Sequence, residues 1–129
     1  MSLTEETARD LFERRRRAWL EDDVDAYLAL WAENMTFQSP VHAEPLRGRE
    51  AFAELIHRSS GHLRPLAFDF HHLAVSGDTV LAEWTIAAET RADGRRIAWR
   101  GMSIAVIRDG LIHEWREYWN PNDLVPGNS

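Results

Sequence analysis

Two chemically useful side chains are missing from this 129-residue chain, and each absence excludes a class of chemistry. No cysteine occurs, so disulfides, thiolate nucleophiles and iron–sulfur ligation are excluded. All fifteen basic side chains are arginine. Without lysine, neither a Schiff-base mechanism nor a pyridoxal cofactor held on a lysine is possible. We therefore expect a protein that works without a cofactor.

Long apolar runs are also missing. No stretch approaches the roughly 20 apolar residues of a membrane span, and no charged-then-apolar leader opens the chain. The formal net charge of -6 argues against nucleic acid as a partner. Together with a hydrophobic fraction of 44%, these features predict one globular domain over residues 1–129, with its core at about 5–121, in the cytoplasm.

The first half of the chain predicts three helices, at about residues 4–20, 23–33 and 48–59. Asp22-Asp23 caps the second of these, with Tyr27 on its inward face. Between the second and third helices, residues 35–38 predict a short strand that ends at Ser39-Pro40, and residues 41–46 predict a loop.

Arg15 breaks the pattern of the first helix because it falls on the apolar stripe rather than on the charged face. Two interpretations are open. Its aliphatic stem could lie along the edge of the core with the charged end in solvent, or its guanidinium could point into a cavity.

The second half predicts four strands, at residues 66–75, 79–90, 96–107 and 111–119, with two Asp-Gly turns between long strands as hairpin signals. Helices followed by such a meander predict an α+β fold with a curved antiparallel sheet and the helices on one face. Met102, Ile104 and Val106 place apolar side chains on the other face as well. That outer face predicts a homodimer.

The last strand carries an acid between two aromatic side chains. Trp115, Glu117 and Trp119 share one face by the two-residue alternation of a strand. If that face is buried, desolvation raises the pKa of the Glu117 carboxyl toward the range useful for proton transfer. The alternative is a glutamate that pairs with an arginine at the end of the strand.

Five segments carry a resemblance to known proteins: Asp25-Ala26-Tyr27-Leu28-Ala29-Leu30-Trp31, Ser39-Pro40 with Glu44-Pro45, Arg47-Gly48-Arg49-Glu50, Asp109-Gly110-Leu111-Ile112, and Arg116-Glu117-Tyr118-Trp119-Asn120-Pro121. They resemble the nuclear transport factor 2-like superfamily, a cystatin-like roll, and within it the SnoaL-like and ketosteroid isomerase-like branch. The resemblance implies a cone, in which a curved antiparallel sheet wraps around three N-terminal helices. It also implies a pocket with an apolar wall for a small apolar or aromatic ligand.

The catalytic residues of the ketosteroid isomerases do not carry over. The positions implied for the general-base aspartate and for the protonated aspartate are Ser39 and Ser103, and the tyrosine of the first helix falls at about Arg15. The resemblance therefore implies that the steroid isomerase reaction does not occur by that mechanism.

The ending Arg116–Pro121 looks most like that of the phenazine-biosynthesis members, in which the matching glutamate is the acid/base of the pocket. This resemblance implies a catalytic role for Glu117. Of the polar pair on the third helix of those members, Ser59 is kept and the histidine is replaced by Leu55. The substrate-binding residues that it implies are Arg15, Tyr27, Ser39, Ser59, Trp84, Trp99, Ser103, Trp115 and Trp119.

The histidines receive different interpretations. His42 follows Ser39-Pro40, in a loop that lies at the mouth of the pocket in such folds, where it either shuttles protons near neutral pH or is simply solvated. His71 and His72 point to opposite faces of a strand and cannot share an ion, so no metal site is expected. His113 shares the face of Glu117 close to a turn and reads as a core histidine.

A three-residue turn at Arg108-Asp109-Gly110 would pair Ile107 with Leu111, which predicts that Gly101 lies opposite Glu117.

Three functional interpretations of the chain are open. The chain is a cofactor-free isomerase, cyclase or dehydratase that uses Glu117, a module that binds a ligand without chemistry, or a dimerisation domain with a filled core.

Overall fold

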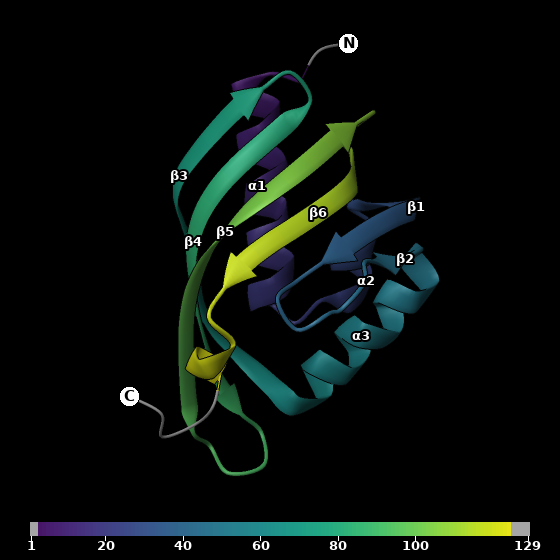
Figure 1. Ribbon diagram of the computed structural model, residues 1–129. Coiled ribbons are helices and arrows are strands. Elements are labelled where there is room, and N and C mark those ends of the chain that lie inside the picture. Colours follow the sequence, from purple (N-terminus) through teal and green to yellow (C-terminus); the bar gives the residue numbers. More distant parts are fainter. Residues whose placement is uncertain (1–2, 125–129) are drawn as a thin grey trace.

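A computed structural model describes residues 3–124, which form three helices, one six-stranded sheet and a short 3-10 helix. In chain order the elements are α1 (Glu5–Leu20), α2 (Val24–Leu28), β1 (Trp31–Gln38), β2 (Leu46–Arg47), α3 (Arg49–His62), β3 (Leu63–Ser76), β4 (Thr79–Thr90), β5 (Arg96–Arg108), β6 (Leu111–Trp119) and η1 (Pro121–Leu124). The strand order is β2-β1-β6-β5-β4-β3, and Figure 1 shows the long strands curving past α1. Within these residues no helix is both long and apolar enough to cross a membrane.

The expected α+β fold is confirmed, with the helices on one side of a curved sheet (Figure 1). Helix α1 contacts β3, and α3 contacts β1. Strands β3 to β6 form the expected antiparallel meander. Strand β1, however, runs parallel to β6, so the sheet is mixed rather than purely antiparallel.

The second predicted helix is shorter than expected. Asp23 caps it, with its Oδ1 accepting from the Ala26 N–H at 3.1 Å, but the helix ends at Leu28. From Trp31 the chain is strand, and the Ile112 N–H donates to the Leu30 carbonyl at 2.9 Å. Pairing with a strand some 80 positions further along the chain outweighs a modest local helix propensity.

Two other boundaries differ from the sequence prediction. Leu46–Arg47, expected to be loop, forms β2 and pairs with Thr36 and Phe37 of β1. Helix α3 continues to His62, straight through Gly61, because Leu63 enters the β3 ladder only after that residue.

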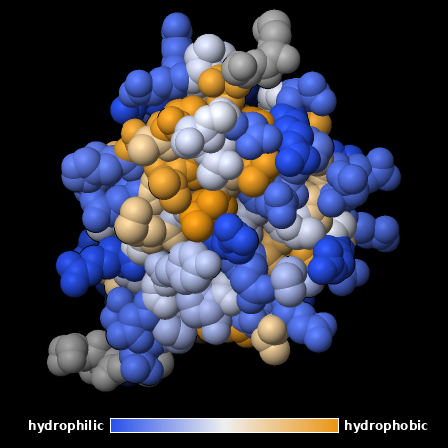
Figure 2. Space-filling model, turned by 45° about the horizontal axis from the view of Figure 1, so that its top comes forward, coloured by the Kyte–Doolittle hydropathy of each residue, from blue (hydrophilic) through white to orange (hydrophobic). Residues whose placement is uncertain are grey.

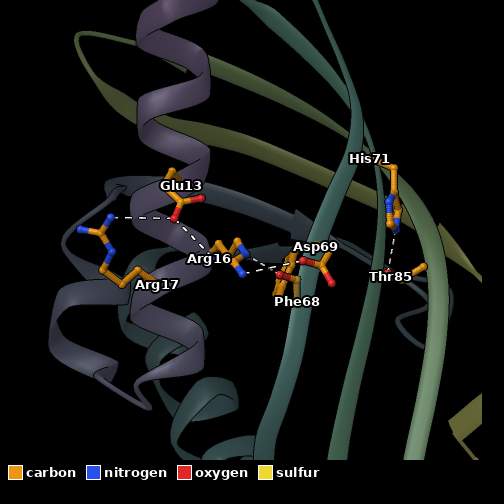
Figure 3. Close-up of polar contacts among 7 residues, drawn as sticks. All are labelled: Glu13, Arg16, Arg17, Phe68, Asp69, His71 and Thr85. Carbon is orange, nitrogen blue, oxygen red and sulfur yellow. Dashed lines mark hydrogen bonds and ion pairs between the residues drawn. The ribbon is translucent and has the colours of Figure 1, made fainter.

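The orientation of α1 is set by contacts at its start and near its end. A capping box joins Thr4 and Thr7 at the N-terminus. Further along, the Nε of Arg16 donates to the Phe68 carbonyl of β3, and its Nη2 lies 3.7 Å from the Asp69 carboxylate, as Figure 3 shows. Adjacent helical residues are about 100° apart. With Arg16 held at the edge of β3, the neighbouring Arg15 lies inside.

The register between β5 and β6 corrects the predicted pairing of Gly101. Asp109 and Gly110 form a two-residue turn with φ of 53° and 75°, and Arg108 pairs with Leu111. Residues with positive φ at both central positions are typical of tight hairpin turns. The shorter turn shifts the pairing by one residue and a bulge at His113 shifts it by another, so Glu117 lies opposite Ser103 and not opposite Gly101, which pairs with Trp119.

A bulge in β6 also corrects the position of His113. Glu114 pairs with Val106 and Ile112 pairs with Ile107, so His113 has no opposite residue in the ladder. The extra residue resets the alternation, and Ile112 takes the core position, fully buried. His113 is partly exposed rather than a core histidine.

Gly101 is required by close packing. A Cβ built there would lie 2.5 Å from the Tyr118 carbonyl oxygen, 2.8 Å from the Trp84 ring and 3.0 Å from the Trp119 Cβ. We expect Gly101→Ala to lower the free energy of unfolding by about 1–3 kcal/mol, the usual cost of overpacking. Urea denaturation followed by tryptophan fluorescence measures it.

The matched control is Gly61→Ala in α3, where a Cβ meets nothing within 4 Å. Alanine favours a helix over glycine, so this variant should gain about 0.5–1 kcal/mol. Equal stability of the two variants would contradict the tight approach at Gly101.

Candidate active site

The candidate site is centred on Glu117, in the middle of the sheet. Its neighbours two positions away on β6 share its face, and both indoles turn toward its carboxylate. Trp115 Nε1 donates to Oε1 at 2.8 Å, and Trp119 Nε1 donates to Oε2 at 2.6 Å. Each oxygen is therefore held by one N–H donor. This arrangement follows directly from strand alternation.

A serine flanks Glu117 on each neighbouring strand. Ser103 lies opposite on β5, fully buried, and its Oγ accepts from Trp84 Nε1 at 2.7 Å. Ser39 follows the Gln38–Arg116 pair between β1 and β6, which places it on the other side of Glu117, and it is 4% exposed. The two positions that the resemblance assigns to the isomerase aspartates thus border one glutamate here.

Arg15 reaches the interior from α1. It is 5% exposed, and its Cζ lies 4.1 Å from the Trp115 ring centre, 5.3 Å from that of Tyr27 and 5.4 Å from that of Phe68. A guanidinium over aromatic faces is stabilised by cation–π attraction. The interpretation that places its charged end in solvent is therefore wrong. Its Nε and Nη1 are buried without a hydrogen-bond partner in the described part of the chain.

The electrostatics of the site favour the neutral acid. Burial raises the pKa of the Glu117 carboxyl, although the positive charge of Arg15 and the two indole donors each lower it. The ion pairs found among residues 3–124 do not include one between Arg15 and Glu117. Burial likewise raises the pKa of Tyr27, so its hydroxyl keeps its proton.

The site opens toward the end of the sheet where β1 and β6 both finish. Glu117 and Trp119 keep some exposure there, whereas Trp115 is buried. The loop that follows β1 lies at the same end, where Ser39 Oγ and His42 Nδ1 are 2.7 Å apart. His42 is thus tied to a serine that borders the carboxylate.

A cavity of about 40 Å³ lies between the helices and the start of β3, lined among others by Ala18, Trp19, Tyr27, Ile56, Ser59 and Pro65. Such a volume holds only one or a few water molecules. Tyr27 forms a wall of this cavity and also contacts Arg15, so the cavity and the buried cation share a side chain.

Most of the predicted site residues are brought together. Arg15, Tyr27, Ser39, His42, Trp84, Ser103, Trp115 and Trp119 surround Glu117 directly or through one neighbour. Two are not. Ser59 is exposed on α3 and lines the small cavity, and Trp99 lies nearer the rim, two residues before Gly101 on β5.

Phe68 is the member of the cluster that the sequence did not single out. It is 1% exposed and supplies the third ring around the Arg15 guanidinium. Its place on the inner face of β3 was readable from alternation with Phe70, but the contact with Arg15 depends on how α1 docks.

No group of three or more histidine, aspartate or glutamate side chains that could hold a metal occurs within residues 3–124. The adjacent histidines of β3 are each engaged separately. His71 Nε2 lies 2.8 Å from Thr85 Oγ1, as Figure 3 shows, and His72 Nδ1 lies 2.9 Å from Glu83 Oε1.

The curved mixed sheet around N-terminal helices, with an acid on the inner face, is a nuclear transport factor 2-like fold of the ketosteroid isomerase-like type. The chain belongs to the SnoaL-like domain family, which it matches over residues 10–115. A curated relative is YesE of Bacillus subtilis, an uncharacterised protein that is 28% identical over 108 residues, 79% of this chain and 74% of its own length.

Solved structures of similar shape carry different names. A Bacillus subtilis protein with a proposed isomerase activity is 27% identical, with a TM-score of 0.83 over 92% of this chain and 89% of its own. An epoxide hydrolase-like protein of Mycobacterium tuberculosis is 23% identical, with a TM-score of 0.78 over 92% and 86%. A Catenulispora acidiphila protein solved with trimethylamine is 16% identical, with a TM-score of 0.78 over 88% of both chains.

The raised pKa of Glu117 makes stability depend on pH. The folded interior favours the protonated acid, so this contribution is present below the ordinary pKa of 4.5 and is lost as pH rises through the folded value. We expect the free energy of unfolding of the wild type to fall relative to that of Glu117→Gln as the pH rises from 4.5 through the folded pKa of Glu117. Urea titrations at a series of pH values measure the difference.

The control is Glu114→Gln, which removes an exposed carboxylate from the same strand. The difference in free energy of unfolding between the wild type and Glu114→Gln should show no comparable change with pH. A constant difference for Glu117→Gln across the series would contradict the raised pKa.

Proposed function

We propose that this protein is a cofactor-free cytoplasmic enzyme in which Glu117 moves a proton on a small, planar, mostly apolar metabolite. The observation that carries the proposal is a carboxyl group held by two indole N–H donors beside a buried guanidinium. The reaction class is isomerisation, cyclisation or dehydration, each of which needs one proton acceptor that then returns a proton.

The chemistry follows from the surroundings of the acid. A general acid/base works best when its pKa lies near the operating pH, and burial shifts the pKa of Glu117 in that direction. Charge that develops on a substrate oxygen can be stabilised by the unpartnered donors of Arg15. Ser103 accepts from Trp84, which leaves its hydroxyl proton available to a second oxygen. Behind Ser39, His42 can exchange protons with solvent.

The aromatic rings around Arg15 bear on the charge of the ligand. The Catenulispora acidiphila protein was solved with a small amine, trimethylamine. In this chain, three rings surround a cation that the chain itself supplies, the guanidinium of Arg15. A second cation would be repelled there, which favours a neutral or negatively charged ligand.

The alternative function is ligand binding without chemistry. It is favoured by the serines at both aspartate positions, and by the small cavity, which an aromatic ligand can enter only if side chains such as Trp19 move. The two functions predict different effects of Glu117→Gln on turnover of the ligand.

The test begins with the native mass of the freshly purified protein compared with its denatured mass, which identifies a bound compound. Turnover of that compound is then measured for the wild type and Glu117→Gln. One well-placed acid/base contributes roughly 10²–10⁴ in rate, so kcat should fall by that factor. Glu114→Gln, on the outer face of the same strand, should leave kcat unchanged.

Full activity of Glu117→Gln would overturn the enzymatic proposal. Binding of the compound by both proteins with no conversion, and loss of that binding in Trp115→Ala, would establish the alternative function instead.

We also propose that the outer sheet face joins two copies of the chain. Leu81, Met102 and Tyr118 of that face are 42%, 49% and 59% exposed, and Ile104 and Val106 lie beside Met102 on β5. Figure 2 shows apolar side chains gathered into a patch with charged residues around it. Exposed apolar patches of this kind commonly mark interfaces.

Sedimentation equilibrium tests the dimer, whose expected mass is twice the 14.9 kDa of the chain. Met102→Asp should give a monomer, because a charge would have to be buried in the interface. Val41→Asp, an equally drastic change at a residue that is 59% exposed in the loop after β1, should remain dimeric. A monomeric wild type would exclude the proposed interface.

A further inference from the structure

We propose that the ligand of this site is an anion, a planar conjugated carboxylate or an acidic enol, that its negative group binds Arg15, and that its binding loads a proton onto Glu117. This inference rests on the proposed function for the location of the site, and it goes further by naming the charge of the ligand and the source of the catalytic proton.

The first argument is the state of Arg15. Two of its nitrogen atoms, Nε and Nη1, are buried and without a partner among the described residues. Leaving a buried donor unsatisfied costs about 1–3 kcal/mol, and more for a charged group. The edge formed by Nε and the Nη atoms is the edge that binds a carboxylate in a two-pronged manner. The rings that surround Cζ attract the cation, and the Tyr27 hydroxyl accepts a hydrogen bond from the Arg15 side chain, but Nε and Nη1 have no acceptor among the described residues.

The second argument is charge balance. A buried cation needs a negative counter-charge, and at a pH above the raised pKa of Glu117 its carboxylate supplies that charge. An anion that arrives beside Arg15 takes over that role and brings a second negative charge close to Glu117. Like charges disfavour ionisation, so the carboxylate of Glu117 takes up a proton from solvent and becomes a carboxylic acid. The net charge of the site stays the same.

The groups that face Glu117 are consistent with this exchange. Arg15 comes from α1 and Tyr27 from α2. The charge of Arg15 lowers both the pKa of the Tyr27 hydroxyl and the pKa of the Glu117 carboxyl. Strand β5 presents Ser103, and the loop after β1 presents Ser39 with His42 behind it. The partial exposure of Glu117 gives the proton a route from solvent.

The shape of the site favours a flat ligand. Trp115 is within 5.6 Å of Phe12 and 5.8 Å of Trp31, between ring centres, so the wall around the carboxylate is aromatic. The space beside Tyr27 is small, a cavity of about 40 Å³. A ring that slides between aromatic side chains needs less displacement than a bulky group.

The test uses a pair of probes with the same shape, benzoate and its neutral analogue benzamide, with wild-type protein and isothermal titration calorimetry. A charge-assisted hydrogen bond is worth about 1.5–3 kcal/mol, so benzoate should bind at least about tenfold more tightly. Titrations in two buffers of different ionisation enthalpy, at mildly alkaline pH, should show uptake of up to one proton with benzoate and none with benzamide.

Variants show which residue causes the preference for benzoate and which causes the proton uptake. Arg15→Met should abolish the preference for benzoate, whereas Arg14→Gln, an exposed arginine of the same helix, should keep it. Glu117→Gln should keep the preference and lose the proton uptake. The wild-type titrations alone decide the proposal if Arg15→Met does not fold.

Benzoate binding that is no tighter than benzamide binding, including no binding of either probe at millimolar concentration, overturns the anion site. Tighter benzoate binding without proton uptake overturns the coupling to Glu117. The proposed enzymatic function fails separately, by full turnover in Glu117→Gln, so a neutral substrate that needs Glu117 would refute this inference alone.

Discussion

The whole site depends on the pairing of one strand with both of its neighbours. Strand β6 is bonded antiparallel to β5 and parallel to β1, so hydrogen bonds fix its register from two sides. A slip of one residue would move every side chain to the opposite face, taking Glu117 and its two tryptophans out of the interior. The tight turn at Asp109-Gly110 and the bulge at His113 determine which residues of β6 face inward.

Within that frame, the interior holds a guanidinium and a carboxyl group that do not form a direct ion pair among the described contacts. The guanidinium of Arg15 is stabilised by rings, and the carboxyl of Glu117 by indole N–H groups. A direct ion pair would lower the pKa of Glu117 and use the hydrogen-bond donors of the Arg15 guanidinium. Because they are apart, Nε and Nη1 of Arg15 have no partner among the described residues and the pKa of Glu117 stays raised.

The comparison with the ketosteroid isomerases gains a physical meaning from this geometry. The positions that the resemblance assigns to the two isomerase aspartates are Ser39 and Ser103, and they border Glu117 from the loop after β1 and from β5. A polar side chain therefore stands at each of these three neighbouring positions. Relatives with isomerase-like and epoxide hydrolase-like names show that one fold supports several chemistries.

By itself the sequence determined the elements and most of the faces. Periodicity placed Trp115, Glu117 and Trp119 together, the two Asp-Gly turns gave the meander, and the absence of lysine and cysteine excluded whole mechanisms, because these properties depend only on local order and residue type. Tertiary structure decided the rest. The helix expected at 23–33 gave way to β1 because a ladder with β6 formed. Ser103 replaced Gly101 opposite Glu117 because the turn was one residue shorter and a bulge at His113 shifted the pairing by one residue more. Periodicity placed Arg15 on the apolar stripe, but only the docking of α1 on β3 decided that its guanidinium lies among aromatic rings and not in solvent. Each of these outcomes depends on contacts between residues far apart in the chain, whose energies local patterns do not contain.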